Sequence, residues 1–252
     1  MSAEKYYLKI TELLSKIHET QGENINRAAQ RMADAIAQKK RVYLYGSGHS
    51  VIPVLDIFPR YGSFVGFFPL YDPRLMWFNV VGPGGARELL WLERREGYAE
   101  IFLQSYPFET GDCMLVFSHG GLNAAPVEAA LYAKNKGLTV ITVSSIENAR
   151  VASATHSSGK KLSDAADIAI DNCVAPEDSQ VDIGRPEKVA AGSTMAAVFI
   201  AMSLVAETGA LLAQRGFPLD TFVSPNVPGI AKDHNQQVFH QFARALASRG
   251  PE

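Results

Sequence analysis

The chain has 252 residues, a formal net charge of -2, and 47% hydrophobic and 20% charged residues. This composition is that of a globular protein able to bury a full core, and the length fits one large domain or two small ones. The longest basic run is Lys39-Lys40-Arg41, so the sequence argues against nucleic acid as a partner.

The cysteines and the apolar segments indicate the cellular environment. Cys113 and Cys173 lie in apolar stretches, and two cysteines do not build a disulfide scaffold in a chain of this length. We expect both to be small buried thiols. We find no apolar run of signal-peptide length at the N-terminus and no stretch of the roughly 20 apolar residues that a membrane span needs. The expectation is a cytoplasmic protein without membrane contact.

The first part of the chain alternates between helical and strand patterns. Hydrophobic spacing predicts two helices, or one kinked helix, over residues 4–39, with an interruption around Gly22. Residues 41–45 are typical of a buried strand that stops at Gly46. A second strand is expected near residues 64–70.

The middle of the chain predicts a parallel sheet. A loop is expected over residues 72–85 and a helix over residues 86–96. Three further short apolar runs have strand length: residues 113–117, 139–143 and 168–171. Because the Ala-rich segment 124–136 between the first two of these runs has helical composition, the unit is βαβ and its strands are parallel.

The last part of the chain predicts two more helices. Residues 188–213 are apolar almost all round, and Glu207 is the one charged residue between Lys188 and Arg215. Such a helix is buried on most sides, which favours a partner subunit. A final helix is expected over residues 234–247. No repeat or linker divides the chain, so we expect a single domain over residues 1–252 with its α/β core at residues 41–215.

The turns that follow the predicted strands carry the candidate ligand residues. In an open parallel sheet the ligand lies beyond the carboxyl ends of the strands, so these turns are the informative positions. The candidates are Gly46, Ser47, His49 and Ser50 after the first strand, Ser118, His119, Gly120, Gly121 and Asn123 after the third, and Ser144 after the fourth.

These residue types favour the binding of a phosphorylated sugar. Glycine lets the backbone approach an anion, helix starts supply positive potential, and hydroxyls add neutral donors. Sugar hydroxyls also need hydrogen-bond partners in a site. One such loop alone would be interpreted as a simple turn, whereas three at equivalent strand ends favour a site.

Neither a nucleotide nor a metal is indicated. The chain lacks a Gly-x-x-x-x-Gly-Lys-[Ser/Thr] motif, and the turn beginning at Gly46 lacks the third glycine of a dinucleotide fingerprint. The six histidines show no paired spacing with one another or with the cysteines. We therefore expect no cofactor and no metal.

Three features together resemble the sugar isomerase (SIS) domain, the fold of phosphosugar isomerases and of sugar-phosphate-sensing regulators. They are the glycine-serine loop after the first strand, the serine-glycine loop after the third, and Gly192-Ser193-Thr194 at the start of the long apolar helix. The spacing of Leu92–Ala99, His156–Leu162 and Asp171-Asn172 is similar to that of a family of SIS proteins of about this length.

The resemblance implies a fold and a ligand class. The fold is a three-layer α/β sandwich with a five-stranded parallel sheet in the flavodoxin-like order 2-1-3-4-5. The ligand is a sugar phosphate, bound without a cofactor, and Ser193 and Thr194 approach it from the start of the apolar helix. A homodimer is expected, with loops of one subunit completing the site of the other.

The loop after the third strand departs from the pattern that the family shows. That loop usually reads Ser-x-Ser-Gly followed by Ser, Thr or Asn, whereas His119 is followed here by Gly120-Gly121. Either backbone N–H groups and His119 compensate for the missing hydroxyl, or the anionic group of the ligand is different, for example a sulfonate or a carboxylate.

The candidate catalytic residues are Glu96, Glu93 and His156. Aldose–ketose isomerisation needs a carboxylate base and an acid that assists ring opening. In related SIS enzymes, including those that cleave an ether from N-acetylmuramic acid phosphate, an acidic residue of a comparable segment transfers the proton, which implies Glu96 first and Glu93 second. His156 is a candidate acid or sugar-hydroxyl ligand. A solvated helix face is the alternative interpretation of the Glu-Arg-Arg-Glu run.

The sequence therefore leaves three alternative functions. The first is cofactor-free isomerisation of a phosphorylated sugar. The second is a lyase or etherase reaction on an amino-sugar phosphate, and the third is a sugar-phosphate sensor without turnover.

Overall fold

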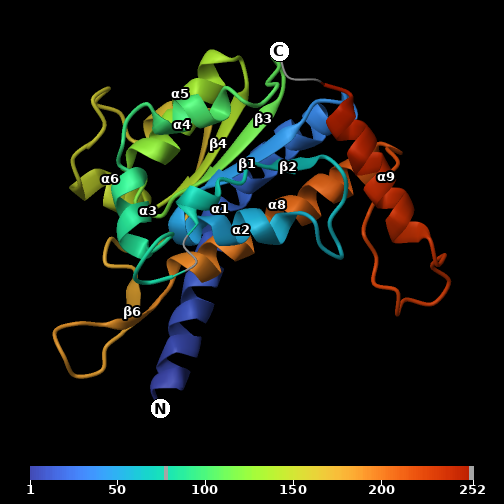
Figure 1. Cartoon of the computed structure of the whole chain (residues 1–252). Helices are drawn as coiled ribbons and strands as arrows, with labels where there is room; N and C mark the ends of the chain where they lie inside the picture. The colour runs from blue at the N-terminus through green and yellow to red at the C-terminus, as the bar shows by residue number, and fades with distance from the viewer. Residues whose placement is uncertain (77–78, 250–252) are drawn as a thin grey trace.

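The structure, a computed structural model, describes residues 1–76 and 79–249 and is built around a five-stranded parallel sheet (Figure 1). The strands are β1 Val42–Gly46, β2 Phe67–Pro69, β3 Cys113–Phe117, β4 Thr139–Ser144 and β5 Ile168–Asp171. Their order is β2-β1-β3-β4-β5, which confirms the predicted order. Residues 77 and 78 of the predicted 72–85 loop lie outside the described residues.

Helices cover both faces of the sheet and make the predicted three layers. One face packs against α1 Ser2–Ala37, α2 Val51–Ile57 and α8 Ser193–Gln214, and the other against α4 Tyr98–Leu103, α5 Ala124–Asn135 and α7 Leu162–Ala165. Alternate residues of β1 point to opposite faces: Leu44 joins the first cluster of buried side chains and Tyr45 joins the second. Burial on both faces explains why the strands are apolar throughout.

The N-terminal segment is one uninterrupted helix rather than two. Gly22 lies within α1, and a side chain at that position would meet open space. A glycine inside a helix costs about 1 kcal/mol relative to alanine. Ile17 and Ile25 are buried on either side of Gly22, and this packing carries the helix through it.

The predicted helix over residues 86–96 ends early, at Leu92, and a turn leads from it to a second short helix. α3 spans Ala86–Leu92, and α4 begins at Tyr98. Gly97 between them has a φ of 84°, a left-handed conformation that glycine adopts without strain. The turn places Glu93 and Glu96 outside a regular helix, so neither belongs to a continuous solvated helix face.

The predicted helix over residues 188–213 begins later than expected. Residues Val189–Ala191 form β7, which pairs antiparallel with β6 (Ser179–Val181) in an exposed hairpin. α8 starts only at Ser193. In Figure 1 the hairpin and the first turns of α1 extend away from the body of the molecule, and the Tyr6 hydroxyl donates to the Ala191 carbonyl at 2.8 Å.

α8 has the length and apolar composition of a membrane-spanning helix. This differs from the sequence analysis, which found no segment that meets this criterion. In the structure one side of α8 packs into the core, with Ala196, Ile200 and Leu204 buried. The opposite side leaves Met195 43% exposed. We interpret α8 as a core helix with one half-exposed apolar side.

The C-terminal helix α9 spans His234–Ala247, as predicted. It lies across the β2 edge of the sheet, where Phe242 contacts the rings of Phe58 and Phe68. The remaining short elements are η1 Gly48–Ser50, η2 Pro73–Leu75 and α6 Ile146–Val151.

Candidate functional site

A small polar cavity lies at the carboxyl ends of the strands, where the sequence predicts a site. Its polar lining consists of His49, Ser50, Ser118, His119, Asn172, Ser193 and Thr194, and its apolar lining of Phe117, Val143 and Ala197. All of these polar residues except Asn172 are predicted ligand residues. The cavity volume is about 20 Å³, room for about one water molecule. In this conformation the cavity is nearly closed.

The turn after β1 is shaped by Gly46. A Cβ atom at Gly46 would lie 2.2 Å from the Ser50 carbonyl oxygen, so a larger residue would force the loop apart. The Ser50 N–H donates to the Ser47 carbonyl at 3.1 Å and closes the turn. This tight loop carries His49 and Ser50 to the cavity.

His119 offers a buried donor at the cavity. Its Nδ1 lies 3.1 Å from Asn172 Nδ2, and if the amide donates there, the proton of a neutral ring is on Nε2. Nε2 is buried and makes no hydrogen bond within the described part of the chain. Burial lowers the pKa of His119 and outweighs the opposite influence of Asp178 and of the Pro176 carbonyl. A neutral ring with a free N–H is suited to bind an oxygen of a ligand.

The start of α8 already holds a carboxylate. Asp178 accepts from the Gly192 N–H at 3.0 Å, from the Ser193 N–H at 2.7 Å and from the Ser193 hydroxyl at 2.8 Å. A negative charge is stabilised at a helix N-terminus. The hydroxyl of Thr194 forms no hydrogen bond to a described residue, so Thr194 is the residue of this pair that remains available to a ligand.

Glu93 lies behind the cavity loops and joins two of them. It is buried, and it accepts from Ser47 Oγ at 2.9 Å and from Asn123 Nδ2 at 2.7 Å. Burial raises the pKa of Glu93, and the Ser47 hydrogen bond and the charge of Arg94 lower it by less. Ser47 and Asn123, both predicted to bind the ligand, thus bind this carboxylate instead of lining the cavity.

Glu96 and His156, two of the three predicted catalytic residues, lie close to each other. Glu96 accepts from the Ser157 backbone N–H at 2.8 Å and from the Ser157 hydroxyl, and these two bonds lower its pKa. His156 Nε2 lies 3.8 Å from Glu96 Oε2. The Ser158 N–H donates to His156 Nδ1 at 3.1 Å, which places the proton of a neutral ring on Nε2. Neither Glu96 nor His156 lines the cavity.

Glu128 completes this group, and the sequence analysis missed it. Its Oε1 lies 3.6 Å from His156 Nε2. Its carboxylate also accepts from the backbone N–H groups of Gly97 and Ala99 at the start of α4. The signal in the sequence is a single acidic residue between the buried Val127 and Ala129 of α5.

The remaining predicted residues support the loops through their backbones. Gly121 has a φ of 64°, and its carbonyl accepts from the Leu162 N–H at 2.9 Å. The Gly120 carbonyl accepts from Asn148 Nδ2 at 2.8 Å. Ser144 is buried, and its carbonyl accepts from the Asn172 N–H at 3.0 Å. Asn172 thereby reaches the cavity, a position that its place directly after β5 could have indicated.

The described residues contain neither a cluster of metal ligands nor a cysteine paired in a disulfide. Across residues 1–76 and 79–249, no three His, Cys, Asp or Glu side chains are grouped so that they could hold a metal ion. Both cysteines are free thiols; Cys113 is buried, as expected, and Cys173 is half-buried. Burial raises the pKa of Cys113 to about 12, which makes it a poor nucleophile near neutral pH.

Fold and site define a class of protein: an open parallel α/β sheet with a polar cavity at its topological switch point. A sequence profile of the SIS domain matches residues 5–145 of this chain. A UPF0309 protein of Oceanobacillus iheyensis is 35% identical over 239 residues, which cover 94% of this chain and 95% of that protein. The chain belongs to the SIS domain family.

Other comparisons agree with this assignment. A UPF0309 protein of Shouchella clausii is 35% identical over 227 residues, covering 90% of this chain and 91% of the relative. The fold is also similar to that of a phosphoheptose isomerase from Francisella tularensis, with a TM-score of 0.52 and 14% identity over 82% of this chain and 96% of the other. A phosphoheptose isomerase from Neisseria gonorrhoeae gives a TM-score of 0.52 and 11% identity, with coverage of 82% and 97%. These two likenesses concern the fold alone.

Proposed function

We propose that this protein binds a sugar phosphate in the strand-end cavity and isomerises it between aldose and ketose forms without a cofactor. The observation that carries the proposal is the lining of the cavity, where hydroxyls and imidazoles from the ends of β1 and β3, the amide of Asn172 after β5 and the hydroxyls at the start of α8 converge. Two of the similar folds belong to phosphoheptose isomerases, which supports the ligand class.

In this proposal neutral donors bind the phosphate. Ser50, Ser118 and Thr194 each have a hydroxyl proton to donate, and His119 adds its buried Nε2–H. His119 thereby takes the place of the hydroxyl that Gly120 lacks, the first of the two alternatives left open by the sequence. Hydrogen bonds to a charged group are stronger than neutral ones, so a few such donors suffice for an anion.

The cavity must open to admit the ligand. Pockets for small molecules have volumes of roughly 300–1,000 Å³, far above the volume of this one. Asp178, which directly precedes β6, is bound to the start of α8, and Ser193 and Thr194 of α8 line the cavity. Displacement of Asp178 by the phosphate would free the N-terminal N–H groups of α8 for the ligand.

Glu96 and His156 are the proposed proton-transfer groups. Hydrogen bonds from Ser157 lower the pKa of Glu96, so Glu96 is ionised at neutral pH, the form in which a carboxylate accepts a proton. His156 Nε2–H, which faces Glu96 and Glu128, is the proposed acid. Since neither Glu96 nor His156 lines the closed cavity, the loop over residues 152–161 must come closer to the sugar when the ligand binds.

A sensor without turnover is the second candidate. The observation in its favour is that the lining of the cavity contains no carboxylate in the described part of the chain. An isomerase needs a base next to the sugar carbons, whereas a sensor needs only donors. Turnover of a bound sugar phosphate distinguishes the two functions.

A homodimer with shared sites belongs to the same proposal. α8 leaves Met195 exposed and Phe199 and Met202 half-buried, an apolar stripe that a second copy would cover. α8 also begins at the cavity, so a partner on this stripe would lie beside the site. Light scattering with parallel assays tests this point, because a monomer with full activity in dilute solution would contradict it.

A thermal-shift screen tests the ligand class. Hexose, heptose, pentose and amino-sugar phosphates are compared with their unphosphorylated sugars and with sulfonated sugars. At a concentration about 100 times Kd, a ligand adds about 2.7 kcal/mol to the free energy of unfolding. For a chain of this size that raises Tm by roughly 5–10 °C.

Variants show whether a positive response comes from the cavity. The double variant Ser118→Ala/Thr194→Val should lose the response to the sugar phosphate. Ser203→Ala, a matched change on α8 outside the cavity whose hydroxyl donates to the Phe199 carbonyl, should keep it. No response to any phosphorylated sugar, or an equal response in both variants, would contradict the proposal.

A further inference from the structure

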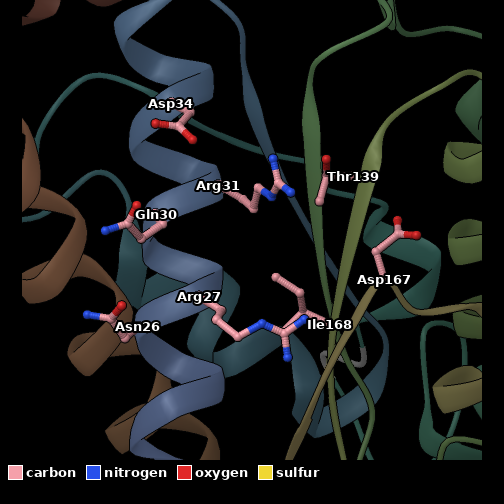
Figure 2. A pocket seen from close by; sticks show the side chains of 8 residues that line it. All are labelled: Asn26, Arg27, Gln30, Arg31, Asp34, Thr139, Asp167 and Ile168. Atoms are coloured by element: carbon pink, nitrogen blue, oxygen red, sulfur yellow. The ribbon is translucent and has the colours of Figure 1, made fainter.

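A second polar recess lies at the opposite end of the sheet, between α1 and the amino ends of β4 and β5 (Figure 2). It is lined by Asn26, Arg27, Gln30, Arg31, Asp34, Thr139, Asp167 and Ile168, and its volume is about 720 Å³. Thr139 and Ile168 are the first residues of β4 and β5, whereas the strand-end cavity lies beyond their last residues. We call this recess the amino-end groove; it is separate from the cavity described above.

Two arginines in the groove lack a neutralising partner. Arg27 and Arg31 stand one turn apart on α1, and Figure 2 shows both side chains extending from α1 toward the strands. Neither forms an ion pair with any residue that the structure describes. The side chain of Arg27 makes one long hydrogen bond, of 3.4 Å, to Asn24 Oδ1, and that of Arg31 makes none within residues 1–76 and 79–249.

The two carboxylates of the groove are already neutralised by other residues. Asp34 pairs with Arg215 at 2.8 Å. Asp167 pairs with Lys134 at 2.9 Å and also accepts from the Val140 N–H at 2.9 Å. The charges of Arg27 and Arg31 therefore remain as the net charge of the groove, which is positive.

This arrangement is suited to an oxyanion with several oxygens. Like charges at positions i and i+4 of a helix repel each other, and an anion between them removes that repulsion. A guanidinium presents a planar fork of donors that matches a pair of phosphate oxygens. The side-chain amide of Gln30 adds a donor that forms no hydrogen bond to a described residue.

We propose that the amino-end groove binds the phosphate groups of a small phosphorylated molecule through Arg27 and Arg31. This site is distinct from the strand-end cavity, and it does not depend on the proposed isomerase function. A ligand there contacts both α1 and the edge of the sheet, so it ties the long N-terminal helix to the strands.

Isothermal titration calorimetry of the full chain with inorganic pyrophosphate tests the groove. The wild type should bind pyrophosphate, and Arg27→Gln/Arg31→Gln should bind it at least tenfold more weakly. Lys5→Gln/Lys16→Gln, which removes the same charge from exposed positions of the same helix, should bind like the wild type. Arg27→Lys/Arg31→Lys keeps the charge without the fork and should have an intermediate affinity.

The strand-end variant separates this proposal from the proposed function. Ser118→Ala/Thr194→Val should keep the affinity for pyrophosphate at the groove while it loses the response to sugar phosphates. If that variant loses pyrophosphate binding and Arg27→Gln/Arg31→Gln keeps it, the anion binds in the strand-end cavity and the groove proposal is wrong. Equal losses in the arginine and lysine variants, or no binding by the wild type, would overturn it as well.

Discussion

The polar side chains beyond the carboxyl ends of the strands form two groups, which differ in whether their hydrogen-bonding atoms have protein partners. On one side, the cavity holds donors without partners, such as His119 Nε2 and the Thr194 hydroxyl. On the other side, Glu93, Glu96 and Glu128 each accept two hydrogen bonds from protein groups. The difference teaches that two donors of the cavity remain open to a ligand, whereas protein groups hold the three carboxylates in place.

The comparison has an energetic basis. A buried donor without a partner costs about 1–3 kcal/mol, so an open donor at a strand end indicates a group that a ligand satisfies. A buried carboxylate costs more, and protein hydrogen bonds offset that cost. In the proposed function, the cavity side binds the ligand and the carboxylate side transfers the proton, so substitutions should affect the two roles one at a time.

The largest effect is expected from Glu96→Gln. If Glu96 is the base, turnover should fall by about 10²–10⁴-fold because general acid–base catalysis contributes that much. Affinity for the sugar phosphate should fall far less than turnover, because a general base acts mainly on the transition state and not on the bound ground state. Steady-state kinetics and calorimetry measure the two quantities, and Glu88→Gln, an acidic residue of α3, is the control. Unchanged turnover in Glu96→Gln would remove Glu96 from the mechanism.

His119→Ala is the corresponding change on the cavity side. A hydrogen bond to a charged group is worth about 1.5–3 kcal/mol, so affinity for the sugar phosphate should fall by roughly 10–100-fold. Calorimetry measures the affinity, and His240→Ala on the exposed side of α9 is the control. An affinity equal to that of the wild type would show that Nε2 does not contact the ligand.

Substitutions of Glu93 test whether this carboxylate holds together the loops after β1 and β3. Glu93→Ala leaves Ser47 Oγ and Asn123 Nδ2 without their acceptor, which should lower the free energy of unfolding by about 1–3 kcal/mol. Glu93→Gln keeps an acceptor and should cost less than Glu93→Ala. Urea unfolding measures both variants. Equal stability of Glu93→Ala and the wild type would show that this carboxylate does not hold the two loops together.

Sequence reasoning placed the cavity better than it placed the carboxylates. The turns that follow the strands are local signals, so the sequence itself indicates His49 and Ser118, whereas Thr194 came from the resemblance to the SIS family. Which acceptor a side chain meets depends on distant segments: Ser47 and Asn123 are 46 and 30 residues from Glu93. No spacing rule predicts such a contact.

The errors in the fold have a similar origin. Gly22 signals a helix break, but the packing of Ile17 and Ile25 against the core overrides it. The apolar residues 189–191 fit a helix and a strand equally well, and pairing with Ser179–Val181 decides for the strand. In both places a long-range contact overrides a local preference.

The two carboxylates should respond to pH in opposite directions. Burial raises the pKa of Glu93 above its usual 4.5, so its contribution to stability is present below about pH 4.5 and is lost as pH rises through the raised value. Hydrogen bonds from Ser157 lower the pKa of Glu96, so its contribution is present above about pH 4.5 and is lost as pH falls through the lowered value.

Unfolding curves of Glu93→Gln and Glu96→Gln between pH 3 and pH 8 measure these two contributions. Relative to the wild type, Glu93→Gln should gain stability as pH rises, and Glu96→Gln should gain stability as pH falls. Parallel pH profiles for the two variants would show that the two carboxyl groups do not differ in the way that their surroundings indicate.

The smallest effect is expected from Ser157→Ala, which tests how Glu96 is held on the carboxylate side. The variant removes one of the two hydrogen bonds to Glu96 and leaves the Ser157 N–H in place. Because one of the two hydrogen bonds that hold Glu96 is lost, turnover should fall by roughly two- to tenfold. The acidic limb of the pH–rate profile should move to higher pH, since the lost bond is the largest influence that lowers the pKa of Glu96. A change in turnover without that movement would mean that Ser157 acts on the loop and not on the base.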